Sequence, residues 1–112
     1  MILLHEMHLA SELIEEARRE GDDICEIEAE VGELAPITCE ELLEALGKLV
    51  DWQVRLSEKQ ACVKCGCGFA GRPSIVAREH DLVLFKCPKC GRVPKVLEGD
   101  AIILKAVLKG GK

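Results

Sequence analysis

The stretch at positions 62–66 reads Cys-Val-Lys-Cys-Gly, and the same form returns at positions 87–91 as Cys-Pro-Lys-Cys-Gly. In each motif the two intervening residues let one tight turn point both thiols at a common centre, and the glycine relieves the crowded backbone. Four thiolates at about 2.3 Å suit Zn(II), which has no electronic preference for another geometry. The motifs therefore predict a tetrahedral Zn(II) site whose ligands are Cys62, Cys65, Cys87 and Cys90.

Disulfides and redox chemistry are the alternatives for these cysteines. The chain has seven cysteines, an odd number that cannot pair completely. A thioredoxin-like site needs a single pair in a βαβ setting, whereas this chain carries two pairs. The spacer at 66–86 is slightly longer than the usual roughly 15–20 residues. It holds Cys67, an alternative ligand to Cys65, and His80, which could approach the metal; the Cys62/Cys65 pair is favoured because its spacing matches that of Cys87/Cys90.

Composition indicates a globular chain without a membrane segment. The 112 residues are 48% apolar, enough for one domain or two small units that share a core. The chain contains no apolar run of about 18 residues, and its N-terminus turns acidic at Glu6 before a signal peptide could develop. Thiols without a secretion signal predict a cytoplasmic location.

The net charge of −5 is unevenly distributed. Residues 1–61 carry 16 acidic and 5 basic side chains, whereas residues 62–96 carry 7 basic and 2 acidic ones. The basic segment suits contact with nucleic acid or with an acidic protein surface.

Outside the cysteine motifs, the sequence alternates between helical and strand patterns. Apolar residues at helical spacing predict a helix at 5–20, and strict alternation predicts a strand at 24–31 with Cys25 pointing inward. A turn follows at 32–37. Thr38 and Glu41 then form a capping box that begins a second helix.

The second helix is expected to run to about Val50 and to bury an apolar stripe made of Leu42, Leu43, Leu46, Leu49 and Val50. Two further strands are predicted at 52–57 and 102–108, and the last one is apolar enough to be covered on much of both faces.

The predicted fold class is α+β, with two helices on a three-stranded, mostly antiparallel sheet. A zinc-ribbon-like insertion with four cysteine ligands lies between the last two strands. The expected domains are an α/β domain at 1–61 plus 97–112 and a zinc-binding domain at 62–96.

His5 and His8 are a second group with metal-binding chemistry. They are three residues apart, so they share a face in a helix, and Glu6 adjoins His5. Imidazole binds nickel, copper and zinc alike, so these residues alone leave the metal open. An exposed first turn that carries polar side chains is the alternative.

The order of the motifs resembles that of the HypA-type hydrogenase nickel-incorporation proteins. The shared features are His-Glu-Met-x-Leu-Ala at 5–10, Val-Gly-Glu-Leu at 31–34, the two Cys-x-x-Cys pairs, and Gly99 before a final strand. The resemblance covers nearly the whole chain and keeps the order of its parts.

This resemblance implies a cytoplasmic nickel metallochaperone rather than an enzyme, with Zn(II) as structural metal and Ni(II) as cargo. His5 would be the principal nickel ligand, Glu6 would lie in or beside the coordination shell, and His8 is a candidate further donor. The implied partners are a nickel-binding GTPase of the hydrogenase maturation pathway and the [NiFe]-hydrogenase large subunit. A homodimer is compatible with the sequence.

The chain departs from the family pattern at its start. In the family the nickel-binding histidine directly follows the initiator methionine, whereas here Met1, Ile2 and Leu3 come first and Leu4 stands in the methionine position. One interpretation is that translation starts at Leu4. The other is that the terminal amine is displaced and His8 donates in its place.

Two other classes of function compete with this prediction. A zinc-ribbon nucleic-acid-binding module would use the basic charge of 62–96, but the rest of the chain is acidic, and Trp52, Phe69 and Phe85 are the only stacking candidates in the sequence. An enzyme could use Cys39 or Cys67 as a nucleophile, yet no sequence motif places a base beside either.

Overall fold

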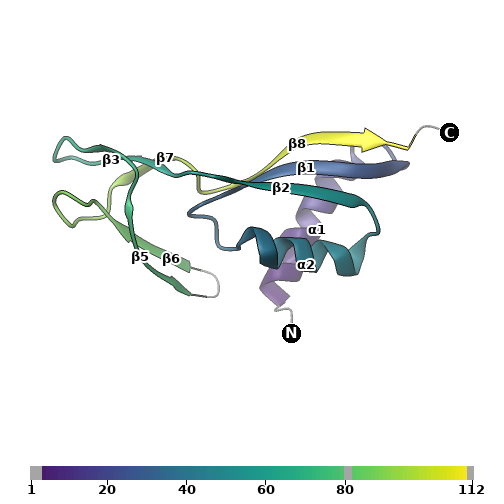
Figure 1. The fold of residues 1–112 in the computed structure, drawn as a ribbon, viewed down its shortest axis with the longest axis horizontal. Coiled ribbons are helices and arrows are strands. Elements are labelled where there is room, and N and C mark those ends of the chain that lie inside the picture. The colour runs from purple at the N-terminus through teal and green to yellow at the C-terminus, as the bar shows by residue number, and fades with distance from the viewer. Residues whose placement is uncertain (1–3, 80–81, 111–112) are drawn as a thin grey trace.

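The computed structural model describes residues 4–79 and 82–110. The molecule is elongated, measuring 55 × 28 × 17 Å, and consists of two units arranged along its long axis (Figure 1). The body contains α1, β1, α2, β2 and β8, and the lobe contains β3 to β7. The predicted mixture of helices and strands is confirmed.

Two helices cover one face of the body sheet (Figure 1). In α1 (Leu4–Arg18) the buried apolar residues recur at helical spacing, and they are Ala10, Leu13, Ile14 and Ala17. In α2 (Cys39–Leu49) the capping box is confirmed, because the Glu41 N–H donates to the Thr38 hydroxyl at 3.1 Å and the Thr38 N–H donates to the Glu41 carboxylate at 2.9 Å. Within the described ranges, neither helix combines the length and apolarity needed to cross a bilayer.

The buried stripe of α2 is narrower than predicted. Leu42, Ala45 and Leu46 are buried, whereas Leu43 and Leu49 are exposed. Leu43 lies about 100° around the helix from Leu42, so it points past the sheet instead of onto it.

The body sheet has the order β2-β1-β8, with β1 (Ile24–Gly32) in the centre. The three strands are as predicted, but the expected mostly antiparallel arrangement is wrong. β8 (Ile102–Lys109) pairs with β1 antiparallel, whereas β2 (Gln53–Lys59) pairs with it parallel. The reason is that α2 is the crossover of a βαβ unit, which returns the chain to the same end of the sheet.

Cys25 is exposed, contrary to the predicted inward orientation. The pairing of β1 with β8 shifts register between Ile24 and Glu26, which breaks strict alternation at the start of the strand. As a result Ile24 and Ile27 are both buried, and Cys25 between them faces solvent.

The other face of the sheet carries no helix from the described part of the chain (Figure 1). β8 therefore presents Leu104 and Val107 to the body core, while Ile103 is 46% exposed and Leu108 is 50% exposed. The prediction that this strand is covered on both faces is wrong.

The lobe consists of two small sheets. β3 (Cys62–Lys64) lies between β4 (Ala70–Gly71) and β7 (Lys95–Glu98), and β5 (Ser74–Glu79) forms a hairpin with β6 (Leu82–Lys86). Its core has few fully buried members, namely Leu34, Ala61, Val63 and Val83, packed against Phe69, Ile75, Phe85 and Val96. So small a core needs further stabilisation.

Three backbone segments cross where the body meets the lobe. A Cβ atom on Gly32 would collide with the backbone carbonyl group of Gly99. Gly99 itself has a φ of +92°, and a Cβ there would lie 2.5 Å from the Cα of Ala61. Only glycine fits at these two positions, because a side chain would collide with backbone.

The bridging segment, residues 33–37, belongs to both units. Leu34 packs in the lobe core, whereas Ala35 and Ile37 pack in the body core. The Leu34 N–H donates to the Gly99 carbonyl at 2.8 Å. This stretch, which the sequence identified only as a turn, therefore fixes the lobe against the body.

We expect Gly32→Ala to destabilise the protein by about 1–3 kcal/mol, because the added methyl group must displace backbone rather than a flexible side chain. Gly47→Ala is the matched control, since Gly47 lies in α2 with nothing within 4 Å of its Cβ position. It should stabilise the protein by about 0.5–1 kcal/mol through helix propensity. Urea unfolding followed by circular dichroism measures both, and wild-type stability of Gly32→Ala would contradict the tight crossing.

Candidate metal centre

Four cysteine thiols converge in the lobe. The Sγ atoms of Cys65, Cys67, Cys87 and Cys90 all lie within 4.8 Å of one another. The Cys65 and Cys90 sulfurs are 3.4 Å apart, and the Cys67 and Cys87 sulfurs are 3.7 Å apart. A tetrahedral ion with sulfur ligands at about 2.3 Å places those sulfurs about 3.8 Å apart. This group can hold a metal ion, and the donor set fits Zn(II).

Two turns, each closed by the N–H of a glycine, deliver these thiols. In the first, the Gly68 N–H donates to the Cys65 carbonyl at 3.0 Å, and in the second the Gly91 N–H donates to the Cys87 carbonyl at 2.9 Å. Both glycines have positive φ, +101° and +80°, the left-handed region that favours glycine. In each turn the glycine directly follows a clustered cysteine, Cys67 or Cys90.

Cys62 is not part of this group, so the predicted ligand set differs from the set that the structure brings together. Cys62 lies in β3, paired opposite Glu98, before the chain turns. The first turn closes at Gly68 rather than at Gly66, and it therefore brings in Cys67 together with Cys65. Two cysteine pairs overlap in this stretch, Cys62/Cys65 and Cys65/Cys67. The register of β3 decides which of them lies in the sulfur group.

The two buried thiols of the group differ in acidity. A hydrogen bond from the Cys67 backbone lowers the pKa of Cys65, but the Cys90 thiol and burial outweigh it and raise that pKa to about 11. Burial raises the pKa of Cys87, but hydrogen bonds from the backbone of Cys90 and Lys89 outweigh it and lower that pKa to about 7. Of these two thiols, Cys87 is therefore the one that more readily becomes a thiolate.

His5, the predicted nickel ligand, is half-buried in the first turn of α1. Its Nε2 lies 3.0 Å from the carbonyl oxygen of Pro36. A carbonyl only accepts hydrogen bonds, so Nε2 donates and Nδ1 is the free nitrogen of the neutral ring. The same ring lines a shallow surface depression with Met7, His8 and Ser11.

Glu6 and His8 have different surroundings. Glu6 is buried, and only 6% of it is exposed. His8 is exposed and its Nε2 pairs with the Glu12 carboxylate at 2.7 Å, one helical turn along. Within residues 4–79 and 82–110, His5, Glu6 and His8 do not form a three-donor group like that of the cysteines.

Cys39, a candidate nucleophile in the sequence, lies partly buried in the first turn of α2. Burial, and then the nearby charge of Glu58, raise the pKa of Cys39, which opposes its use as a nucleophile. His80 and residues 1–3 lie outside the described residues.

Glu33 is a functional candidate that the sequence analysis used only as part of a motif. Its side chain is 8% exposed, and its two carboxylate oxygens accept from the Ala61 N–H, at 3.1 Å, and from Arg72. A buried carboxylate requires such partners. The available signal was an acidic residue in the otherwise apolar stretch at 31–35.

Comparison with known proteins finds similarity both in sequence and in structure. No family model matches the chain. Hydrogenase maturation factor HypA of Methanocella arvoryzae is 28% identical over 115 residues, which cover 93% of this chain and 96% of that protein. The solution structure of the Ni metallochaperone HypA from Helicobacter pylori matches with a TM-score of 0.61 and 16% identity, over 96% of this chain and 98% of that one. The chain is HypA-like in sequence and in fold.

The resemblance expected from the motifs is thereby confirmed. A second solution structure, of HypA protein, matches with a TM-score of 0.59 and 17% identity over 98% of this HypA-like chain and 99% of that one. At these identities the two structures establish the fold, and the sequence relative establishes the likeness along the chain.

We expect Cys67→Ser to lower zinc affinity strongly and Cys62→Ser to leave the zinc content at one ion per chain, because only Cys67 lies in the sulfur group. The pair is a matched test, since both variants remove one thiol from the same strand and turn. Titration with Co(II), whose thiolate absorption bands count sulfur ligands, measures the difference. Loss of one sulfur ligand in Cys62→Ser, with wild-type spectra for Cys67→Ser, would restore the original ligand set.

Zinc affinity should fall as the pH is lowered, and more steeply below about pH 7. Zinc binds thiolates, so protons compete with it wherever a ligand thiol is protonated in the metal-free protein. With its pKa of about 11, Cys65 must release a proton throughout the neutral range. With its pKa of about 7, Cys87 adds a further proton to this competition only below that value. Chelator competition above and below pH 7 measures how steeply the zinc affinity depends on pH. An equal steepness on both sides would contradict the low pKa of Cys87.

Proposed function

We propose that this chain is a nickel metallochaperone that carries Ni(II) at His5 and holds a structural Zn(II) through Cys65, Cys67, Cys87 and Cys90. The observation that carries the proposal is the likeness to HypA over 93% of the chain, joined to a four-sulfur group in the lobe. The relatives are described as a hydrogenase maturation factor and a Ni metallochaperone.

The two sites suit different tasks. Four thiolates make a closed, tetrahedral cage from which zinc exchanges slowly, and such sites stabilise small folds outright. The lobe has a core too small to fold without that contribution. Zinc is therefore the resident ion, and the chemistry that it supplies is structural.

Nickel as cargo needs an open site with nitrogen donors. His5 offers Nδ1, because its Nε2 donates to Pro36, and the first turn of a helix leaves backbone N–H groups without intrahelical partners. Imidazole and backbone nitrogen are ligands that Ni(II) accepts readily. Glu6 adjoins this donor, and His8, at the surface, is available as a further ligand once it leaves Glu12.

Delivery requires protein partners. We propose a nickel-binding GTPase of the hydrogenase maturation pathway as the partner in transfer and the [NiFe]-hydrogenase large subunit as the recipient. The basic charge of residues 62–96 favours an acidic surface on one of them. The unpaired state of all seven cysteines accords with a reducing cytoplasm.

Two observations count against the alternative of a nucleic-acid-binding zinc ribbon. The three stacking candidates pack into cores, Trp52 in the body and Phe69 and Phe85 in the lobe. Two basic residues of the lobe, Arg72 and Arg78, contact Glu33. Aromatic platforms and free cations are what a single-strand binder needs on its surface.

His5→Ala is expected to abolish tight nickel binding, because it removes the imidazole that the Pro36 carbonyl orients. His8→Ala should weaken nickel binding. Titration calorimetry of the zinc-loaded full chain with Ni(II) measures both. Zinc content serves as the control, since neither histidine lies in the sulfur group. Unchanged nickel affinity after His5→Ala would contradict the proposed site.

A further inference from the structure

Glu33 makes four contacts outside the bridging segment, and the first is the hydrogen bond that its N–H donates to the Lys59 carbonyl of β2 at 2.8 Å. Its Oε1 accepts the Ala61 N–H at 3.1 Å, its Oε2 pairs with Arg72, and its backbone carbonyl accepts from Arg78 of β5. The carboxylate is 8% exposed, so its pairing is shielded from solvent. One residue of the bridging segment is thus fixed by the lobe through both its side chain and its backbone.

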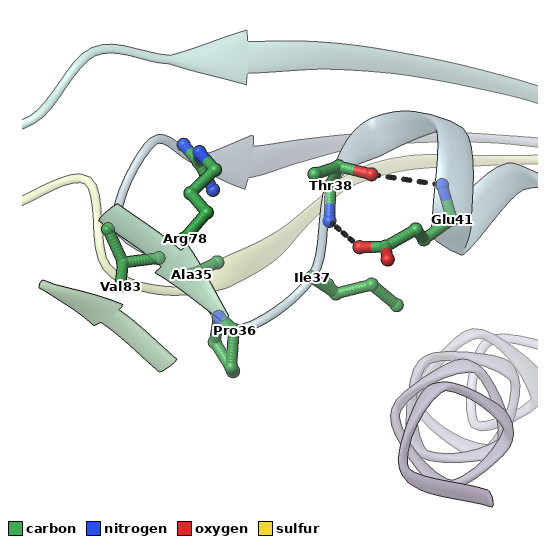
Figure 2. Close-up of a pocket in the computed structure, with 7 residues that line it drawn as sticks. All are labelled: Ala35, Pro36, Ile37, Thr38, Glu41, Arg78 and Val83. Carbon is green, nitrogen blue, oxygen red and sulfur yellow. Dashed lines mark hydrogen bonds between the residues drawn. The ribbon is translucent and has the colours of Figure 1, made fainter. Parts of the chain in front are cut away.

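The rest of the bridging segment has little freedom. A pocket lies beside the bridging segment. It is lined by Ala35, Pro36 and Ile37 of the segment and by Arg78 and Val83 of the lobe (Figure 2). The Ala35 N–H donates to the Gly32 carbonyl at 3.0 Å. Proline adds a fixed φ, which leaves ψ as the one soft backbone torsion that orients its carbonyl.

The carbonyl of Pro36 is the group that accepts the His5 Nε2–H at 3.0 Å. A histidine that binds a metal usually donates its other ring N–H to a carbonyl or carboxylate, which fixes the protonated nitrogen and the orientation of the ring. The contact with the lobe at Glu33 and the contact that orients His5 therefore lie close together on one short segment.

We propose that Glu33 is a positioning residue for nickel binding. By fixing the bridging segment against the lobe it holds the Pro36 carbonyl on Nε2 of His5 and so presents Nδ1 to the metal. The proposal rests on the proposed nickel site at His5 and identifies a residue outside the metal shell that sets the affinity of that site.

Glu33→Gln tests it with little change of shape. The amide keeps one acceptor for Ala61, but it places an NH₂ donor against Arg72, which offers only donors. The matched control is Glu30→Gln, because Glu30 pairs with Lys105 at 3.9 Å on the open face of the sheet. In zinc-loaded full chain titrated with Ni(II), we expect about tenfold weaker nickel binding for Glu33→Gln and wild-type binding for Glu30→Gln.

A readout without nickel tests the same inference independently. Long-range ¹⁵N–¹H NMR of the His5 ring reports which nitrogen carries the proton. Wild type and Glu30→Gln should show the proton on Nε2, whereas Glu33→Gln should show a mixture of both forms. If Glu33→Gln fails to fold, Arg78→Met removes the bond to the Glu33 carbonyl and leaves the carboxylate in place.

The outcomes separate the two proposals. Wild-type affinity together with a wild-type ring spectrum in Glu33→Gln, or in Arg78→Met if that variant is needed, would overturn the role of Glu33 even if His5 binds nickel. If wild type binds no nickel at His5, the proposed function fails, and the ring spectrum still decides whether Glu33 positions the histidine.

Discussion

The lobe has so small a core that the closure of four thiols on one point is the constraint on which the rest of its structure depends. Val63 and Val83 are buried in that core, but half of the large apolar side chains of the hairpin, namely Val76, Leu82 and Leu84, are exposed. Structural zinc contributes an apparent free energy of about 10–16 kcal/mol in small peptides, which exceeds what such a core supplies. With the proposed zinc bound, the positions of β5 and β6, and with them the contacts that Arg78 and Val83 make with the bridging segment, follow from the metal.

The bridging segment connects the lobe to the body through contacts with both cores. It begins where Gly32 meets Gly99, and its residues alternate between the two cores, with Leu34 in the lobe and Ile37 in the body. Since its Pro36 carbonyl also accepts the His5 ring N–H, the surroundings of the proposed cargo ligand are set by both units. The division of labour between a closed sulfur cage and an open nitrogen donor thus has a structural connection as well as a chemical one.

Local patterns predicted the elements well, because periodicity and capping are encoded within a few residues. The helical spacing from Ala10 to Ala17 and the reciprocal bonds of Thr38 and Glu41 are examples. The features that differ between prediction and structure depend on pairing between distant residues. The bulge that turns Cys25 outward, and the strand register that leaves Cys62 outside the sulfur group, are set by β8 and β7. Two overlapping cysteine motifs fit the same sequence, and only the fold chooses between them.

X-ray absorption spectroscopy on protein loaded with one equivalent each of zinc and nickel tests most directly whether the two ions occupy separate sites. We expect four sulfur neighbours at about 2.3 Å around zinc. Around nickel we expect only nitrogen or oxygen neighbours, imidazole among them. Sulfur in the nickel shell, or nitrogen and oxygen replacing sulfur around zinc, would show that the two ions are not divided between the cysteine group and His5.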